Sequence, residues 1–268
     1  MKVCIIGNSL VSLTLAKALT NMGISVDIFF TKKQNIPDSS RTLGISSSNV
    51  DFFNKHILNI EKILWSIKNI KIFTENFSKN EILNFSNSNK NLFSLLKNLE
   101  LYKMLNAKLK KDKLLKFYKA IDYKNIKKRN YKLIITCDSN HEITKKFFSK
   151  RISKDYYSRA YTTIVTHKKI INNVAIQIFT RDGPIAYLPI SNTQTSVVYS
   201  FKKRGDQKID IKNLIKKFNP KFTITNIKKI KAFELRSSNL RKYYKNNILA
   251  FGDMLHQIHP LAGQGFNM

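Results

Sequence analysis

A strand, a glycine turn, a helix, a second glycine and a second strand follow one another within the first thirty residues of the chain. Lys2–Ile6 is a short apolar run, and Gly7 interrupts it. From Leu10 to Met22 the apolar residues recur at the three- and four-residue spacing of an amphipathic helix. Gly23 ends that helix, and Ile24–Phe30 is a second strand. This order predicts a βαβ unit, whose right-handed crossover places both strands in one parallel sheet.

The turn between the first strand and the helix carries part of the dinucleotide-binding pattern. That pattern places glycines where the tight turn, the approach of a phosphate and the packing of helix on strand need them. Here the three positions read Gly7, Ser9 and Ser12. Serine is small and can donate to a phosphate oxygen, and the helix N-terminus offers N–H groups to an anion. We expect these residues to face a pyrophosphate, although a plain βαβ unit with no cofactor fits this segment about as well.

The middle of the chain changes from alternating helices and strands to closely spaced strands. Four β-rich runs follow one another at a spacing of roughly ten residues, which is typical of an antiparallel sheet. These runs are Ser158–Val165, Val174–Thr180, Ile185–Ile190 and Thr195–Phe201. A helix at Ile209–Phe218, extended segments at Phe222–Ile227 and Lys229–Phe233, and a last strand at Ile248–Phe251 follow. Before them the pattern predicts helices at Ser47–Ile57 and Leu99–Leu109 and strands at Lys71–Thr74, Ile82–Phe85, Phe93–Leu96, Leu114–Tyr118 and Tyr131–Thr136.

These elements predict an α/β fold in which a mostly antiparallel domain is inserted into a Rossmann-like parallel sheet. We assign residues 1–70, 97–153 and 235–268 to the parallel-sheet domain, which is discontinuous in the sequence. Residues 71–96 and 154–234 form the inserted domain.

The segment after the last strand combines residues that can surround a flat ring with sugar attached. Gly252–Asp253 stands just past a strand end, where a carboxylate can accept hydrogen bonds from sugar hydroxyls. Pro260 fixes the approach of the chain, and Gly263 and Gly265 allow backbone to come close to a ring. A helix that begins near Gln264 would aim its N–H groups at that ring. The alternative is a loop rich in glycine and proline ahead of a helix.

Four stretches of the sequence resemble those of one family. Arg41–Ser46 is similar to an arginine-containing segment of that family, and Tyr131–Ile135 with Asp138 is similar to its middle motif. Asp182–Pro189 is similar to its Gly-Pro-x-Ala-x-x-Pro strand, and Gly252–Asn267 is similar to its flavin-binding Gly-Asp motif. On these motifs the chain resembles the class A FAD-dependent aromatic monooxygenases, which have the p-hydroxybenzoate hydroxylase fold. Within that family it looks like the ubiquinone-biosynthesis hydroxylases.

The resemblance implies FAD as cofactor of the parallel-sheet domain and NAD(P)H as the co-substrate that reduces it. The reduced flavin would hydroxylate an aromatic ring, such as that of a ubiquinone-precursor prenylphenol, above a floor formed by the sheet from Ser158 to Phe201. Arg41 would lie beside the flavin, Asp253 beside its ribityl chain, and Gly263–Asn267 beside the isoalloxazine. The resemblance assigns no catalytic residue and no metal ligand. The cofactor-binding residues that it implies are Gly7, Ser9, Ser12, Arg41, Asp138, Gly252, Asp253, Pro260, Gly263, Gln264, Gly265, Phe266 and Asn267.

Two other functions remain open at this point. The first turn has serine in place of two glycines, and the middle motif keeps only its aspartate. The chain can therefore also be a degenerate, non-catalytic FAD-binding paralogue that acts as a scaffold. A flavin-dependent reductase of the same fold would consume NAD(P)H without incorporating oxygen. The sequence ends at Met268, where members of the family continue further, so we expect a fragment or a shortened member.

The net charge and its distribution along the chain indicate which classes of partner the protein can bind. The chain has 48 Lys and Arg against 17 Asp and Glu, a formal net charge of +31. The lysines are spread along the whole chain and no basic stripe is interleaved with aromatic residues, so we expect no nucleic-acid partner. We expect a small aromatic or prenylated phenol as substrate, and consider weak attraction to an anionic membrane and membership of a biosynthetic complex. The expected location is the cytoplasm, with the inner face of the membrane as the alternative.

The cysteines and the C-terminal histidines are expected to be structural. Cys4 and Cys137 lie in apolar runs and are expected to be buried free thiols. His256 and His259 are expected to be polar loop residues with satisfied hydrogen bonds. No acidic or cysteine partner accompanies them, so a metal site is not expected there.

Overall fold

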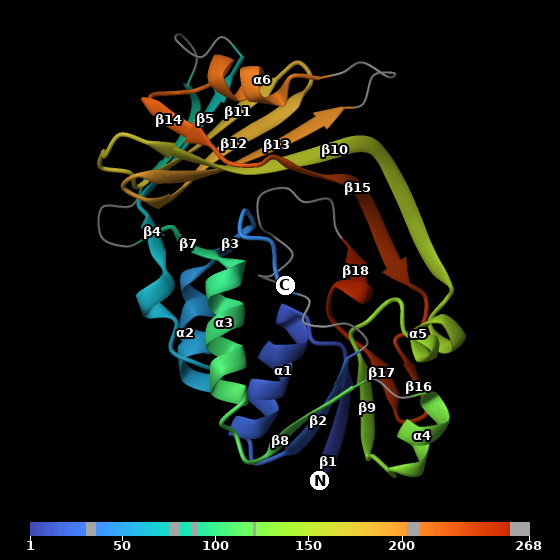
Figure 1. Cartoon of the computed structure of the whole chain (residues 1–268). Helices are drawn as coiled ribbons and strands as arrows, with labels where there is room; N and C mark the ends of the chain where they lie inside the picture. The colour runs from blue at the N-terminus through green and yellow to red at the C-terminus, as the bar shows by residue number, and fades with distance from the viewer. Residues whose placement is uncertain (31–35, 76–80, 87–90, 120–121, 203–208, 258–268) are drawn as a thin grey trace.

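Parallel strands form the lower sheet in Figure 1, as the opening βαβ pattern predicts. The computed structural model describes residues 1–30, 36–75, 81–86, 91–119, 122–202 and 209–257. Within these residues the lower sheet has six strands, and every neighbouring pair except β16–β17 is parallel. In spatial order they are β16 (Tyr244–Lys245), β17 (Ile248–Ala250), β9 (Leu133–Thr136), β1 (Lys2–Ile6), β2 (Ser25–Phe30) and β8 (Leu115–Lys119).

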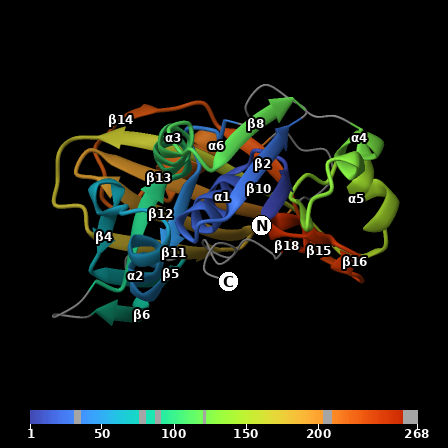
Figure 2. The same ribbon diagram turned by 90° about the horizontal axis from the view of Figure 1, so that it is seen from below.

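Helices cover both faces of this sheet. The helix α1 (Leu10–Asn21) buries Leu13 and Ala16, and its periodic apolar face predicted this packing. Figure 2 shows α4 and α5 at one side of the molecule and α2 and α3 at the other. The remaining helices are α2 (Ser47–His56), α3 (Asn98–Leu109), α4 (Tyr123–Lys128), α5 (Glu142–Phe147), α6 (Ile211–Lys217) and the two 3₁₀ turns η1 (Glu61–Ile63) and η2 (Gly252–Met254). No helix in the described ranges is long and apolar enough to cross a membrane.

The upper sheet in Figure 1 is the inserted, mostly antiparallel one, as the strand spacing predicts. It has nine strands among the described residues, and only the β11–β5 pair is parallel. Its outer face packs on α6, and its inner face is turned toward the six-stranded sheet (Figure 1). The strands are β5 (Asn69–Thr74), β6 (Glu81–Ser86), β10 (Arg151–His167), β11 (Val174–Thr180), β12 (Gly183–Ser191), β13 (Gln194–Lys202), β14 (Ile224–Ile227), β15 (Lys231–Leu240) and β18 (His256–Gln257).

Two strands of the upper sheet are longer than the sequence pattern predicts. β10 begins at Arg151 rather than Ser158, and β15 continues to Leu240 rather than ending at Phe233. The two strands remain paired from Thr162↔Lys231 to Arg151↔Leu240, and Figure 1 shows this ribbon descending beside the lower sheet. In its lower half the start of β10 is mostly exposed, and β15 has four polar residues, Arg236–Asn239, between Leu235 and Leu240, so neither strand shows the apolar alternation on which strand prediction depends. The ribbon crosses the predicted domain boundaries at 153 and 234.

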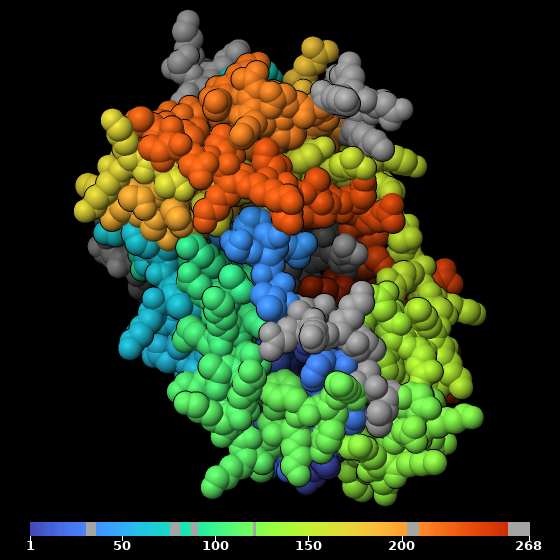
Figure 3. Space-filling model, viewed as in Figure 1, coloured from blue at the N-terminus to red at the C-terminus, as the bar shows by residue number. Residues whose placement is uncertain are grey.

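A small third sheet connects the two large ones. β7 (Phe93–Lys97) pairs with β3 (Thr42–Ile45) and β4 (Trp65–Ile67). Thr42 Oγ1 donates to Ser196 Oγ of the upper sheet at 2.9 Å. In the space-filling view the blue segment after β2 lies directly below the orange strands (Figure 3). The segment expected to contact a flavin is therefore fixed against the inner face of the upper sheet.

Asp27, the aspartate within β2, is buried and has a structural role. Its carboxylate is 1% exposed and accepts from Lys2 Nζ at 2.8 Å and from the Tyr131 hydroxyl. Burial, reinforced by this carboxylate, raises the pKa of Tyr131 well above its usual value. The residue at the end of β2, where dinucleotide-binding folds place a ribose-binding acid, is Phe30.

Tyr131→Phe is expected to lower the free energy of unfolding by about 1–3 kcal/mol, because it removes a donor from a buried carboxylate. Urea unfolding followed by circular dichroism measures the change. Tyr244→Phe is the matched control, since the Tyr244 side chain is 72% exposed. Equal stability of the two variants would show that the Tyr131–Asp27 hydrogen bond contributes nothing net.

Candidate functional site

Three chain segments meet at the carboxyl edge of the six-stranded sheet. Ile6, Thr136 and Ala250 end β1, β9 and β17 and are register partners across the sheet. The backbone continues in step beyond them: Cys137 N donates to Ile6 O at 2.8 Å, and Phe251 N donates to Thr136 O at 2.9 Å. The following loops therefore leave the sheet side by side at the N-terminus of α1. In open parallel sheets this edge is where ligands bind.

Two glycines bring the first and third of these loops against α1. Gly7 has φ +111°, and a Cβ placed there would lie 3.3 Å from Ser12 Oγ and 3.5 Å from Asp138 Cβ. Gly252 has φ +77°, and a Cβ there would lie 2.6 Å from Val11 Cγ1. Both backbones adopt a conformation that favours glycine. The loops at Gly7 and Gly252 thus pack closely around the first turn of α1 and form a backbone cradle there. A side chain at either glycine would fill this space.

The two serines predicted to face a pyrophosphate lie in that first turn. Ser9 is the N-cap of α1; its Oγ accepts from Ser12 N at 3.4 Å and lies 3.1 Å from Ser12 Oγ. Both hydroxyls stand where the pattern has glycines; Ser9 is partly exposed at the helix N-terminus, where an anion can bind, whereas Ser12 is fully buried. Cys137 lies beside Ser12, and burial raises the pKa of its thiol to about 12, against the opposing hydrogen bond from Ser12. The thiol is therefore protonated at neutral pH and unsuited to act as a nucleophile.

Arg41 is exposed and lies against the upper sheet. Its guanidinium is 5.1 Å from the ring centroid of Phe233 on β15, a cation–π contact. Its backbone is fixed at both ends, since Arg41 N donates to Asp38 O and Asn98 N donates to Arg41 O. The Asp38 carboxylate in turn accepts from Ser40 N and Ser40 Oγ, which lowers the pKa of Asp38. Arg41 is thus held on a rigid segment between the two sheets.

The two aspartates predicted to contact the cofactor both lie near Cys137. Asp138 and Asp253 come two and three residues after the ends of the neighbouring parallel strands β9 and β17, so both lie at the same edge of the sheet. Burial raises the pKa of the Cys137 thiol, and the charges of these two carboxylates raise it further. Asp138 Oδ1 accepts from Asn140 N at 2.8 Å, which holds the loop after β9 in a turn. Asp253 is exposed in η2. The structure therefore brings Gly7, Ser9, Ser12, Asp138, Gly252 and Asp253 together.

Other predicted residues lie apart from this group or outside the described ranges. His256 Nδ1 lies 2.7 Å from Asn239 Oδ1, which confirms the satisfied hydrogen bond, but the predicted loop is wrong because His256 lies in β18, paired with β15. Both cysteines are free, Cys4 buried and Cys137 partly so. Outside the described residues lie His259, Pro260, Gly263, Gln264, Gly265, Phe266 and Asn267.

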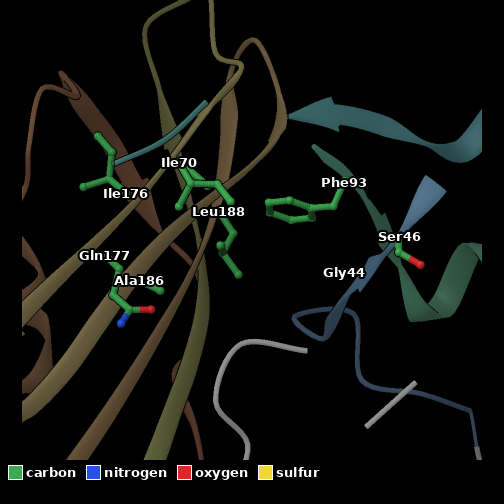
Figure 4. Close-up of a pocket in the computed structure, with 9 residues that line it drawn as sticks. Gly44, Ser46, Ile70, Phe93, Ile176, Gln177, Ala186 and Leu188 are labelled. Carbon is green, nitrogen blue, oxygen red and sulfur yellow. The ribbon is translucent and has the colours of Figure 1, made fainter. Parts of the chain in front are cut away.

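A cavity of about 250 Å³ lies between the inner face of the upper sheet and the small third sheet (Figure 4). Ile70, Phe93 and Leu188 supply most of its apolar wall, and Gln177 brings an amide from the sheet floor. Gly44 and Ser46, which follow Arg41 in the chain, complete the side nearest the third sheet. Although the chain is strongly basic, none of the described residues that line this cavity is charged.

Sequence reasoning did not identify the cavity residues individually. One signal was present: Gln177 is the amide in the otherwise apolar run Val174–Phe179, at a position that shares its sheet face with Ala175. A polar residue at an inward position of a strand is uncommon and marks either a structural hydrogen bond or a site. Ile70 and Phe93 carry no such signal, because they resemble ordinary core residues.

Comparisons with known proteins show which sequences and folds the chain is similar to. No protein-family model matches the chain. The mitochondrial ubiquinone biosynthesis monooxygenase COQ6 of Danio rerio is 25% identical over 187 residues, which cover 54% of this chain and 39% of that protein. The 3-demethoxyubiquinol 3-hydroxylase of Escherichia coli is 30% identical over 99 residues, which cover 34% of this chain and 25% of that protein. The matched part thus spans well under half the length of these curated relatives.

Solved structures are similar over almost the whole chain. The p-nitrophenol 4-monooxygenase PnpA of Pseudomonas putida superposes with a TM-score of 0.77 at 12% identity, over 98% of this chain and 75% of that one. HpxO of Klebsiella pneumoniae, solved in complex with FAD, superposes with a TM-score of 0.75 at 13% identity, over 99% of this chain and 77% of that one. The chain therefore has the fold of the FAD-dependent aromatic monooxygenases, and its sequence is similar to those of the ubiquinone-biosynthesis hydroxylases.

Proposed function

We propose that the chain is an FAD-dependent hydroxylase of an uncharged aromatic ring, with NAD(P)H as its reductant. One observation carries the proposal: the loops after β1, β9 and β17 converge on the first turn of α1, while the inner face of the upper sheet has a cavity whose described lining residues are uncharged. The first feature suits a dinucleotide and the second suits an apolar ring. The similarity to the curated hydroxylases and to the FAD complex of HpxO supports the same function.

The residues at the sheet edge fit FAD at its phosphate end. The close packing at Gly7 excludes a side chain but leaves backbone and the Ser9 hydroxyl at the helix N-terminus, as a pyrophosphate requires, and the buried Ser12 hydroxyl lies 3.1 Å from that of Ser9. Asp253 would accept hydrogen bonds from the ribityl hydroxyls, and Arg41 would lie on the flavin side. The predicted isoalloxazine contacts from Gly263 to Asn267 complete the proposed set.

When bound and reduced, FAD supplies the activation of O₂ and the transfer of oxygen to the ring. The protein's own contribution is binding and orientation. Ile70, Phe93 and Leu188 exclude water from the ring, and the Gln177 amide lies where it can hydrogen-bond a ring hydroxyl. No described lining residue is an acid or base, so orientation of the ring is the main role that we assign to the cavity.

The same comparison supports a proposal for the substrate, and the net charge supports one for the setting. Because the matched relatives belong to ubiquinone biosynthesis, we propose a prenylated phenol as substrate. The net charge of +31 favours weak association with an anionic membrane surface, and therefore a location at its cytoplasmic face. Membership of a biosynthetic complex is part of the same proposal.

A second candidate is a non-catalytic FAD-binding scaffold. It is favoured by the use of Asp27 inside the sheet, by Phe30 at the end of β2 and by the self-capped turn at Ser9. Purified protein separates the candidates: substrate-stimulated NAD(P)H oxidation supports the hydroxylase, whereas bound flavin without such oxidation supports the scaffold. A reductase of the same fold would oxidise NAD(P)H without incorporating labelled O₂ into product.

Asp253→Ala is expected to weaken FAD binding by about tenfold or more, because a charged hydrogen bond contributes about 1.5–3 kcal/mol. Ser9→Ala is expected to cost less, since the helix N–H groups at the pyrophosphate remain. Fluorescence titration with FAD measures both dissociation constants. Asp51→Ala, which removes an exposed acid of α2, controls for the change in net charge. Equal affinities of the Asp253 and Ser9 variants would mean that Asp253 is not the anchor.

A further inference from the structure

The edge strand of the upper sheet exposes two apolar side chains on its cavity side. Leu83 and Phe85 of β6 are 49% and 48% exposed. They are the register partners of Ile72 and Ile70 on β5, so all four side chains belong to the same face of the sheet. A solvent-facing edge strand is ordinarily protected by charged residues, which makes this pair of exposed apolar residues unusual.

The charged residues of the same two strands lie on the opposite face. Lys71 pairs with Asn84 in the register, and Lys71 Nζ forms a 2.9 Å ion pair with Glu81. The inner face therefore has hydrocarbon at these register positions, whereas the opposite face mixes the charged pair with Ile82, which is 49% exposed. We name the inner set, Ile70, Ile72, Leu83 and Phe85, the β5–β6 track.

This track is continuous with the cavity. Ile70 lines the cavity and pairs with Ala175, a second lining residue, on β11. Ile72 pairs with Gln177, a third lining residue. Each row therefore runs from an exposed side chain on β6, through β5, to the cavity wall on β11 without a charged residue.

The cavity alone is too small to enclose an aromatic ring that carries a long hydrocarbon chain. Its volume of about 250 Å³ is below the roughly 300–1,000 Å³ of sites that bury ligands of drug size, so it encloses a ring but not a long chain. On the opposite side the sheet face is covered, since Thr42 Oγ1 donates to Ser196 Oγ and Ser40 Oγ lies 3.5 Å from Thr162 Oγ1. Among the described residues, the apolar route out of the cavity leads along the β5–β6 track.

We propose that the β5–β6 track binds the hydrocarbon chain of an amphipathic aromatic substrate whose ring occupies the cavity. The inference rests on the proposed function, because that function places the ring in the cavity. Each methylene group of the chain that the track buries strengthens binding by up to about fourfold. The track therefore selects for chain length, while the cavity selects for an uncharged ring.

The single tryptophan gives a readout that requires neither cofactor nor turnover. Trp65 packs in the same apolar cluster as Ile70, Phe93 and Leu188, all of which line the cavity. Quenching of its fluorescence can be titrated with 4-methylphenol, which is little more than a ring, and with 4-hexylphenol. We expect 4-hexylphenol to bind at least about tenfold more tightly. The double variant Leu83→Thr, Phe85→Thr should lose most of that difference and keep the affinity for 4-methylphenol.

Threonine keeps the β-propensity of the edge strand, and thermal unfolding verifies that the variants fold. Asn84→Thr controls for a change on the opposite face of β6, and Ile152→Thr controls for loss of an exposed apolar side chain on the distant start of β10. Both controls should keep the full chain-length difference. The inference is overturned if 4-hexylphenol does not bind more tightly, if the double variant retains the difference, or if a control loses it equally. Failure of the proposed function shows separately, as absence of flavin binding and hydroxylation.

Discussion

Gly183→Ala is expected to lower the free energy of unfolding by about 3–5 kcal/mol, the sum of backbone strain and overpacking. Gly183 follows the Arg181–Asp182 turn between β11 and β12 and has φ +134°. A Cβ at this position would lie 2.0 Å from Ser200 O, a backbone atom of the neighbouring strand β13. Neither strand can move aside cheaply, because Lys202 N donates to Asp182 O at 2.8 Å at the same place.

Chemical unfolding monitored by circular dichroism measures this effect. Gly44→Ala is the matched control, since a Cβ there would meet Phe93 at an ordinary contact distance of 3.6 Å. We expect the Gly44 variant to remain within about 1 kcal/mol of the original protein. A Gly183 variant as stable as the Gly44 variant would contradict the close approach of Gly183 to Ser200 O of the neighbouring strand β13.

Gly252→Ala is expected to have the second large effect, and this one reaches the cofactor site. The new Cβ would lie 2.6 Å from Val11 Cγ1, on the turn of α1 that carries Ser9 and Ser12. Valine is stiff, so α1 or the loop after β17 must shift. We expect a loss of about 2–4 kcal/mol in stability and at least about tenfold weaker FAD binding.

Gly23 offers a close control for this prediction. Its φ of +76° matches the +77° of Gly252, but a Cβ there would have no neighbour within 4 Å. Gly23→Ala should therefore show only the backbone cost, about 1–2 kcal/mol, with unchanged FAD affinity. Adding Val11→Ala to Gly252→Ala should restore part of both losses. If the double variant recovers nothing, steric contact with Val11 is not the cause.

Much of the fold follows from local sequence patterns. The β1–α1–β2 unit and the β11–β12–β13 strands were predicted with closely similar bounds, because apolar periodicity and glycine breaks directly report on buried faces. The patterns missed α4 and α5, which have six residues each, too few for a helical period to stand out. They also missed the lower halves of β10 and β15, whose pairing depends on backbone hydrogen bonds between polar segments.

The site could be predicted only in part, for a different reason. Gly7, Ser9 and Ser12 are neighbours in the sequence, so their common location follows from one turn. The contacts of Gly252 with Val11 and of Arg41 with Phe233 join segments about two hundred residues apart, and no local pattern reports them. The cavity is even harder to predict from the sequence, because it forms where two sheets meet. The strongly basic composition gives no indication that the described residues lining the cavity are uncharged.

The most direct test of the account is a titration of the purified chain with FAD, followed by turnover with NAD(P)H, a 4-alkylphenol and labelled O₂. We predict binding of one FAD per chain, substrate-stimulated oxidation of NAD(P)H, and one labelled oxygen atom in the ring of the product. A folded chain that does not bind FAD would contradict the central claim, since the convergence of three loops on α1 would then serve only the packing of the sheet.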